Sequence, residues 1–154
     1  MALDMLVIAE AALLTADLNQ LVKYTLGRER PFVHRLEDDD KSQTKHPSDN
    51  NLSFYSAHTS ISFSVVTAAA TVATMRGYKG APLVWALGRP LAAFTGYLRI
   101  AADRHYLSDV LVGAVLGSAV GVLAPLLLHG PRDSKGSGMS LSASSNALTL
   151  TFRN

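Results

Sequence analysis

Three residue types that could carry out phosphoryl chemistry lie between Leu98 and Asp109. His105 and Asp109 are four residues apart, so a helix that begins near His105 would place them on one face, within hydrogen-bonding reach. A carboxylate that accepts from one ring nitrogen leaves the other nitrogen unprotonated and nucleophilic. Arg99 precedes this pair, where a guanidinium could hold an oxyanion in front of the ring. The three side chains together indicate phosphoryl transfer.

The same residues also have ordinary explanations, because a histidine at the start of an apolar helix is often a capping or interfacial residue. Two upstream clusters favour the chemical interpretation. The first contains Lys23 and Arg30, with Pro31 directly after the arginine. The second contains Ser56 and His58.

In chain order, the patterns Lys-x6-Arg-Pro, Ser-x-His and Arg-x5-His-x3-Asp resemble the three-part signature of the type 2 phosphatidic acid phosphatase (PAP2) superfamily. This superfamily includes lipid phosphatases, bacterial nonspecific acid phosphatases and vanadium haloperoxidases. The resemblance covers residues 23–109 and is specific, because chance agreement with the first and last patterns is rare.

The resemblance implies a role for each of three catalytic residues. His105 is expected to attack phosphorus and to hold it as a phosphohistidine. His58 is expected to protonate the leaving oxygen and then to activate the water that releases phosphate. Asp109 is expected to orient His105. For His58 the alternative is a helix-cap or interfacial histidine.

The resemblance also implies a phosphate-binding set, which consists of Lys23, Arg30, Arg99, Ser56 and Ala57. Three fixed cations around the equatorial oxygens would stabilise the transition state, so neither a metal nor another cofactor is expected. The alternative for each cation is an interfacial side chain that snorkels to the membrane surface.

Two residues depart from the usual pattern of the family. Ala57 stands where glycine is common, which would cost about 1 kcal/mol if the backbone there required positive φ. Leu98 replaces a serine that commonly precedes the clamp arginine. Neither change removes a proton-transfer group, so activity is expected.

The composition is typical of a membrane protein. Of 154 residues, 48% are hydrophobic and only 17% are charged. The formal net charge of +2 is too small to indicate a nucleic-acid partner. Cysteine is absent, so the chain offers no disulfide framework or thiolate metal site. No cleaved signal peptide is evident.

The apolar segments predict an all-α membrane bundle of about four transmembrane helices, near residues 5–22, 55–75, 82–98 and 105–128. Polar residues of the first segment must then face the bundle interior. Pro90 is expected to kink or restart the third helix. In the fourth, Gly113, Gly117 and Gly121 form a smooth stripe for helix packing.

With four crossings, all candidate site residues emerge on one face of the membrane and both termini on the other. Basic residues near the termini then indicate that the face carrying the termini is cytoplasmic, so the site is expected to face outward. The resemblance implies the same orientation for bacterial lipid phosphatases, and we expect a bacterial inner membrane. Membrane relatives usually carry about six helices, so we expect a shortened chain that relies on a homo-oligomer or helper subunit.

The remaining segments are a polar loop and a tail. The loop, residues 23–54, contains the acidic run Glu37–Asp40, which is interpreted as a solvated face, with anion steering or a metal site as alternatives. We expect the phosphatase domain to end at residue 129 and residues 130–154 to be a flexible tail. Residues 147–153 alternate as a strand does, but no partner strand is evident.

These observations favour a metal-independent phosphatase of a lipid phosphate monoester or diphosphate at the membrane face. Two alternatives stay open. One is a catalytically weakened or truncated relative with a binding or structural role. The other is a soluble acid phosphatase or haloperoxidase relative, against which the uncharged segment 110–128 argues.

Overall fold

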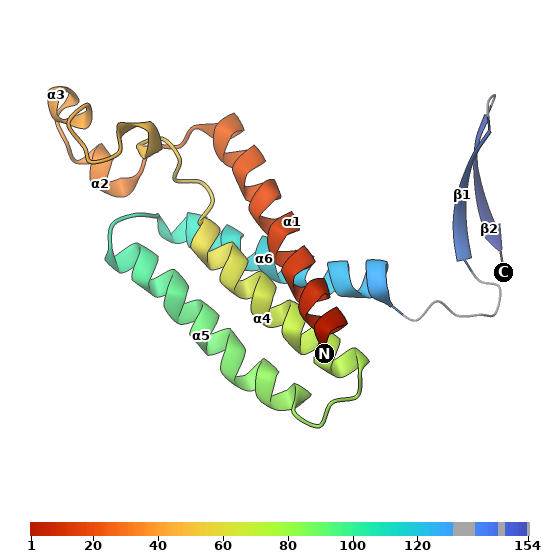
Figure 1. Cartoon of the computed structure of the whole chain (residues 1–154). Helices are drawn as coiled ribbons and strands as arrows, with labels where there is room; N and C mark the ends of the chain where they lie inside the picture. The colour runs from red at the N-terminus through yellow and green to blue at the C-terminus, as the bar shows by residue number, and fades with distance from the viewer. Residues whose placement is uncertain (131–137, 145–146, 154) are drawn as a thin grey trace.

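Four long helices form an up-and-down bundle in the computed structural model, which describes residues 1–130, 138–144 and 147–153 (Figure 1). Helix α4 packs against all three others and therefore forms the centre of the bundle. Since the helices alternate in direction, α1 and α5 end where α4 and α6 begin. The four helices are α1 (Ala2–Leu26), α4 (Ala57–Met75), α5 (Ala81–Ala101) and α6 (Leu107–His129).

The long loop after α1 contains three short helical turns. They lie beyond one end of the bundle, next to the end of α1 and the start of α4 (Figure 1). The acidic run forms most of α3, and its side chains are solvent-exposed. The turns are α2 (Pro31–His34), α3 (Asp38–Lys41) and the 3-10 helix η1 (Pro47–Asp49).

Small side chains fill the interior of the bundle. The buried apolar cluster consists of Ala11, Ala68 and Ala124. Gly117 and Gly121 are also buried, and a methyl group at either position would collide with α4, at the Ser60 carbonyl or the Thr67 hydroxyl. The glycine stripe predicted for this helix is confirmed, because it lets the α6 backbone approach α4 closely.

Large apolar side chains lie on the outside instead. Along α5, Leu83, Leu87 and Leu91 recur every four residues and are 60%, 64% and 66% exposed. Within the described residues, α1 and α6 are long and apolar enough to cross a membrane. Small and polar side chains inside the bundle, with large apolar side chains outside, are typical of helices that pack in lipid.

The polar residues of α1 divide between the two sides of the helix. Thr15 and Asn19 are buried, and they donate hydrogen bonds to Ser64 Oγ at 2.9 Å and to the Tyr55 carbonyl at 2.8 Å. Asp17 and Gln20, in contrast, are exposed. The expectation that all polar residues of this segment face the interior is therefore wrong for these two.

Helix α5 continues through Pro90 and does not restart there. Proline has no backbone N–H, so the helix loses one hydrogen bond within one turn and is regular on both sides of it. The neighbouring Arg89 stacks over the Trp85 ring, 4.3 Å from the ring centroid.

Two strands form an antiparallel hairpin in the tail, β1 (Gly138–Ser144) and β2 (Ala147–Arg153). Residues 147–153 were expected to belong to a flexible tail, although they alternate as a strand does. In the structure they form β2 and pair with β1. Part of the predicted tail, residues 131–137, 145–146 and 154, lies outside the described residues.

Candidate active site

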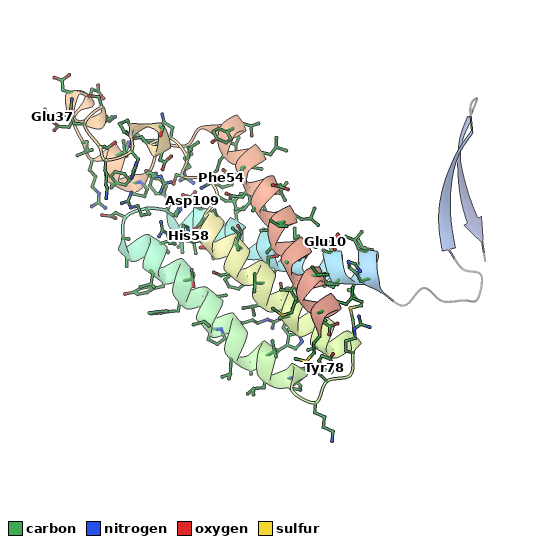
Figure 2. All side chains as sticks on the ribbon, in the orientation of Figure 1. Glu10, Glu37, Phe54, His58, Tyr78 and Asp109 are labelled. Carbon is green, nitrogen blue, oxygen red and sulfur yellow. The ribbon has the colours of Figure 1, made fainter. Side chains whose placement is uncertain are left out.

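The chain brings its predicted site residues together at the end of the bundle that carries α2 and α3. Figure 2 shows His58 and Asp109 at this end. Lys23 and Arg99 lie in the last turns of α1 and α5, while Arg30 directly precedes α2. All three cations lie within electrostatic reach of His58.

His105 lies just before α6, since the helix begins at Leu107. Its Nδ1 is 2.8 Å from the Ser53 carbonyl oxygen. A carbonyl oxygen can only accept, so this contact places the ring proton on Nδ1 and leaves the Nε2 lone pair free. The imidazole therefore has the protonation pattern that a nucleophile needs.

Asp109 does not make the direct hydrogen bond to His105 that the spacing predicted. The shortest separation, from Asp109 Oδ2 to His105 Nδ1, is 3.8 Å, which is too long for a hydrogen bond. The reason is that His105 precedes the helix, so the two residues do not share a helical face. The carboxylate is nevertheless fully buried.

Three other donors bind the Asp109 carboxylate. Ser53 Oγ donates to Oδ2 at 2.6 Å, and the Tyr106 backbone N–H donates to the same oxygen at 3.0 Å. Arg28 Nη1 donates to Oδ1 at 2.6 Å. These bonds fix the carboxylate at the start of α6.

Arg28, which lies outside the three sequence patterns, is also part of the site. Besides Asp109, its Nη1 binds Ser108 Oγ at 2.9 Å, and its guanidinium stacks 4.2 Å from the Tyr106 ring centroid. The only sequence signal is its place two residues before Arg30. Arg104, a second arginine outside the three patterns, is exposed and stacks on the Phe32 ring, 4.9 Å from its centroid.

The electrostatic surroundings of His105 favour its neutral form. The side chain is almost fully buried, and this burial lowers the pKa of His105 because it disfavours the imidazolium ion. The charges of Arg30 and Lys23 lower this pKa further, while Asp109 and the Ser53 carbonyl partly oppose the effect.

The three cations of the predicted clamp are held in different ways. Lys23 is buried, with 8% of its surface exposed. Arg30 is fixed by two bonds to the loop, from Nε to the Asp49 carbonyl at 2.8 Å and from its backbone N–H to the Asn50 carbonyl at 2.9 Å. Arg99 Nε is buried and has no hydrogen-bond partner among the described residues. A buried donor of this kind would be satisfied by an anionic ligand.

The second motif forms the start of α4. Ser56 is the N-cap, and its hydroxyl accepts from Thr59 Oγ1 at 2.9 Å. Ala57 is the first residue of the helix and does not have a positive φ, so the strain that a positive φ would cause does not arise. The backbone N–H groups of Ala57 and His58 lack intrahelical acceptors by position, which suits them to an anion. His58 is exposed and is not the helix cap.

The acidic loop was considered as a possible metal site. Among the described residues, no three His, Cys, Asp or Glu side chains are close enough together to hold a metal ion.

Comparison with known proteins shows that the resemblance to the PAP2 superfamily extends beyond the three motifs. The family model of the PAP2 superfamily matches residues 4–132. The chain belongs to this superfamily. Mouse phospholipid phosphatase 2 is 30% identical over 138 residues, which covers 73% of this chain and 48% of the mouse protein. The human phospholipid phosphatase 2 is 32% identical over 139 residues, covering 73% of this chain and 46% of that protein.

A bacterial relative matches the chain as well. Lipid A 1-phosphatase of Porphyromonas gingivalis is 35% identical over 101 residues, which covers 66% of this chain and 18% of that protein. The chain therefore matches about half the length of its mammalian relatives and a smaller share of the bacterial one. No solved structure matches the chain significantly.

Proposed function

We propose that this PAP2 protein is a membrane phosphatase that hydrolyses a lipid phosphate monoester or diphosphate through a phosphohistidine, without a metal. The observation that carries the proposal is a buried imidazole with its proton on Nδ1, within electrostatic reach of Lys23 and Arg30. This arrangement combines a neutral nucleophile with positive charges that attract a phosphate group.

In the first step, His105 Nε2 attacks phosphorus and the bond from phosphorus to the lipid oxygen breaks. His58 donates a proton to that oxygen, so the lipid leaves as an alcohol, or as a monophosphate when the substrate is a diphosphate. Lys23, Arg30 and Arg99 stabilise the charge on the equatorial oxygens. Ser56 caps the helix whose first amides, at Ala57 and His58, add further donors.

In the second step, neutral His58 accepts a proton from water, and the resulting hydroxide attacks phosphorus. The bond between phosphorus and His105 Nε2 breaks, which releases inorganic phosphate and restores the free imidazole. Asp109 acts throughout by orienting His105, and its carboxylate also accepts from the N–H of Tyr106, the next residue in the chain.

The proposed membrane arrangement has four crossings, by α1, α4, α5 and α6. Support comes from the apolar exterior and from the site at one end of the bundle, near the membrane surface, where a lipid phosphate would lie. We further propose a bacterial inner membrane with the site facing outward. Two relatives are named as phosphatases of phospholipids and of lipid A, and this supports a lipid substrate. Phosphatidic acid, phosphatidylglycerol phosphate and polyprenyl diphosphate all fit.

The test is phosphate release from short-chain phosphatidic acid and from polyprenyl diphosphate by the detergent-purified chain, with EDTA present. Wild type should release phosphate, and His105→Ala should lose at least about a thousandfold in kcat, because the nucleophile is removed. The matched control is His46→Ala, an exposed loop histidine that should keep full activity. A folded wild type that is inactive on both substrates, or an active His105→Ala, would contradict the proposal.

A further inference from the structure

We propose that Ser53 is the positioning residue of the nucleophile and that the hydrogen-bonded connection from Asp109 to His105 runs through Ser53. This inference rests on the proposed phosphatase function for its kinetic consequences. The geometry itself does not depend on that function.

Ser53 lies between the two residues and binds both of them. Its hydroxyl donates to Asp109 Oδ2 at 2.6 Å, and its backbone carbonyl accepts from His105 Nδ1 at 2.8 Å. The direct separation between Asp109 and His105 is 3.8 Å. Ser53 is fully buried, so water does not compete for either bond.

The segment around Ser53 is itself fixed on both sides. The Ser53 N–H donates to the Arg28 carbonyl at 2.9 Å, and the Ser56 N–H donates to the Asp109 carbonyl at 3.0 Å. Arg28 also binds the Asp109 carboxylate at 2.6 Å. The hydrogen bonds among these residues therefore hold the Ser53 carbonyl in place. One of them, from the Ser53 hydroxyl to Asp109, can be removed by mutation.

Removal of this hydroxyl should affect turnover more than substrate binding. Without it, Asp109 Oδ2 loses one of two donors and the carbonyl that orients the imidazole is less firmly held. No bond in the structure joins Ser53 to Lys23, Arg30 or Arg99, so the cations that attract phosphate should be unaffected. Ser53→Ala should therefore lower kcat and leave KM nearly unchanged.

The kinetic test is a double-mutant cycle on kcat for phosphate release. Ser53→Ala should lose about tenfold or more, the size expected for a hydrogen bond to a charged group. Since Asp109 acts through Ser53, the double variant with Asp109→Ala, which removes the acceptor of the Ser53 hydroxyl, should be no slower than Asp109→Ala alone. Full activity in Ser53→Ala, or losses that multiply in the double variant, would overturn the inference.

Two further variants separate positioning from folding. Ser64→Ala removes an equally buried hydroxyl from the α4 packing face, away from the site, and should keep the wild-type kcat. Ser53→Thr keeps the hydroxyl and should retain kcat within about threefold, so it tests the inference even if Ser53→Ala fails to fold. A folded Ser53→Thr with the loss predicted for alanine would overturn the inference.

A spectroscopic measurement tests the geometry without any turnover. Imidazole 15N shifts, assigned with His105→Ala, should report His105 protonated at Nδ1 in the wild type and a mixture of tautomers in Ser53→Ala. A His105 signal that is the same in both proteins would overturn the inference. If the wild type released no phosphate, the proposed function would fail while these shifts still tested Ser53.

Discussion

At the scale of single residues, the two histidines differ in environment in the way that their proposed roles require. His105 is almost fully buried and has a carbonyl acceptor on Nδ1, while His58 is exposed at the start of α4. A buried neutral imidazole is a good nucleophile. An exposed one can exchange protons with the leaving group and with water.

The environment of His105 predicts a pH dependence. Its pKa is lowered from 6.5 by burial and by the charges of Arg30 and Lys23, so the neutral nucleophile persists below pH 6.5. The acid limb of kcat/KM, corrected for ionisation of the substrate, should therefore have its midpoint below pH 6.5. Arg30→Gln removes one of the charges and should move that midpoint to higher pH. A wild-type midpoint above 6.5 would contradict this description of the site.

Residue types and spacing predict part of this site and not the rest. Both histidines, Asp109 and the three cations could be identified because each belongs to a short pattern. Ser53 and Arg28 could not, since their importance depends on bonds to α6 across more than fifty residues of sequence. The direct bond predicted between Asp109 and His105 depended on where α6 begins, and the actual start at Leu107 replaces it with the contact to Ser53.

At the scale of elements, the contact between α4 and α6 holds the site together. The glycines of α6 lie against the α4 backbone, and His105 and His58 lie at the same end of this contact. Any side chain that separates the two helices should therefore also separate the two histidines.

This arrangement predicts the effect of a single methyl group. Gly117→Ala would place its Cβ against the Ser60 carbonyl, a backbone atom that cannot move independently of its helix. We expect a loss of about 2 kcal/mol in the free energy of unfolding, measured in detergent. Ala119→Val enlarges an exposed position two residues further on and is the control, expected to be neutral. Equal stabilities for the two variants would contradict close packing of α4 and α6.

Helix positions could largely be predicted because apolar, uncharged segments of this length form few other structures. The restart of the helix that was one expectation at Pro90 was not found, because turns on both sides of a proline can keep a helix continuous. Strand β1 was missed although Met139, Leu141 and Ala143 alternate with serines, because this short serine-rich segment was assigned to the flexible tail. Its structure depends on pairing with β2.

At the scale of the whole molecule, the proposal requires that the two ends of the bundle lie on opposite sides of a membrane. The absence of cysteine makes this directly testable, because any introduced thiol is unique. In intact inverted and right-side-out vesicles, Ser48→Cys and Lys79→Cys, which are exposed at opposite ends, should react with an impermeant maleimide from opposite sides. Labelling of both from the same side would contradict a single crossing by α4, the long helix between the two positions.

The central claim is that His105 forms a covalent bond to phosphorus, and a trapped intermediate tests this most directly. The chain is mixed with an activated aryl phosphate carrying 32P, whose leaving group needs no proton from His58. The reaction is quenched in alkali, in which phosphohistidine survives, and the chain is digested for mass spectrometry. His58→Ala should accumulate label on the peptide that contains His105, because water is no longer activated to release it. His105→Ala should carry none. Alkali-stable label on a peptide without His105 would contradict the mechanism. Phosphate release by the wild type with no labelled histidine in the wild type or in His58→Ala would also contradict it.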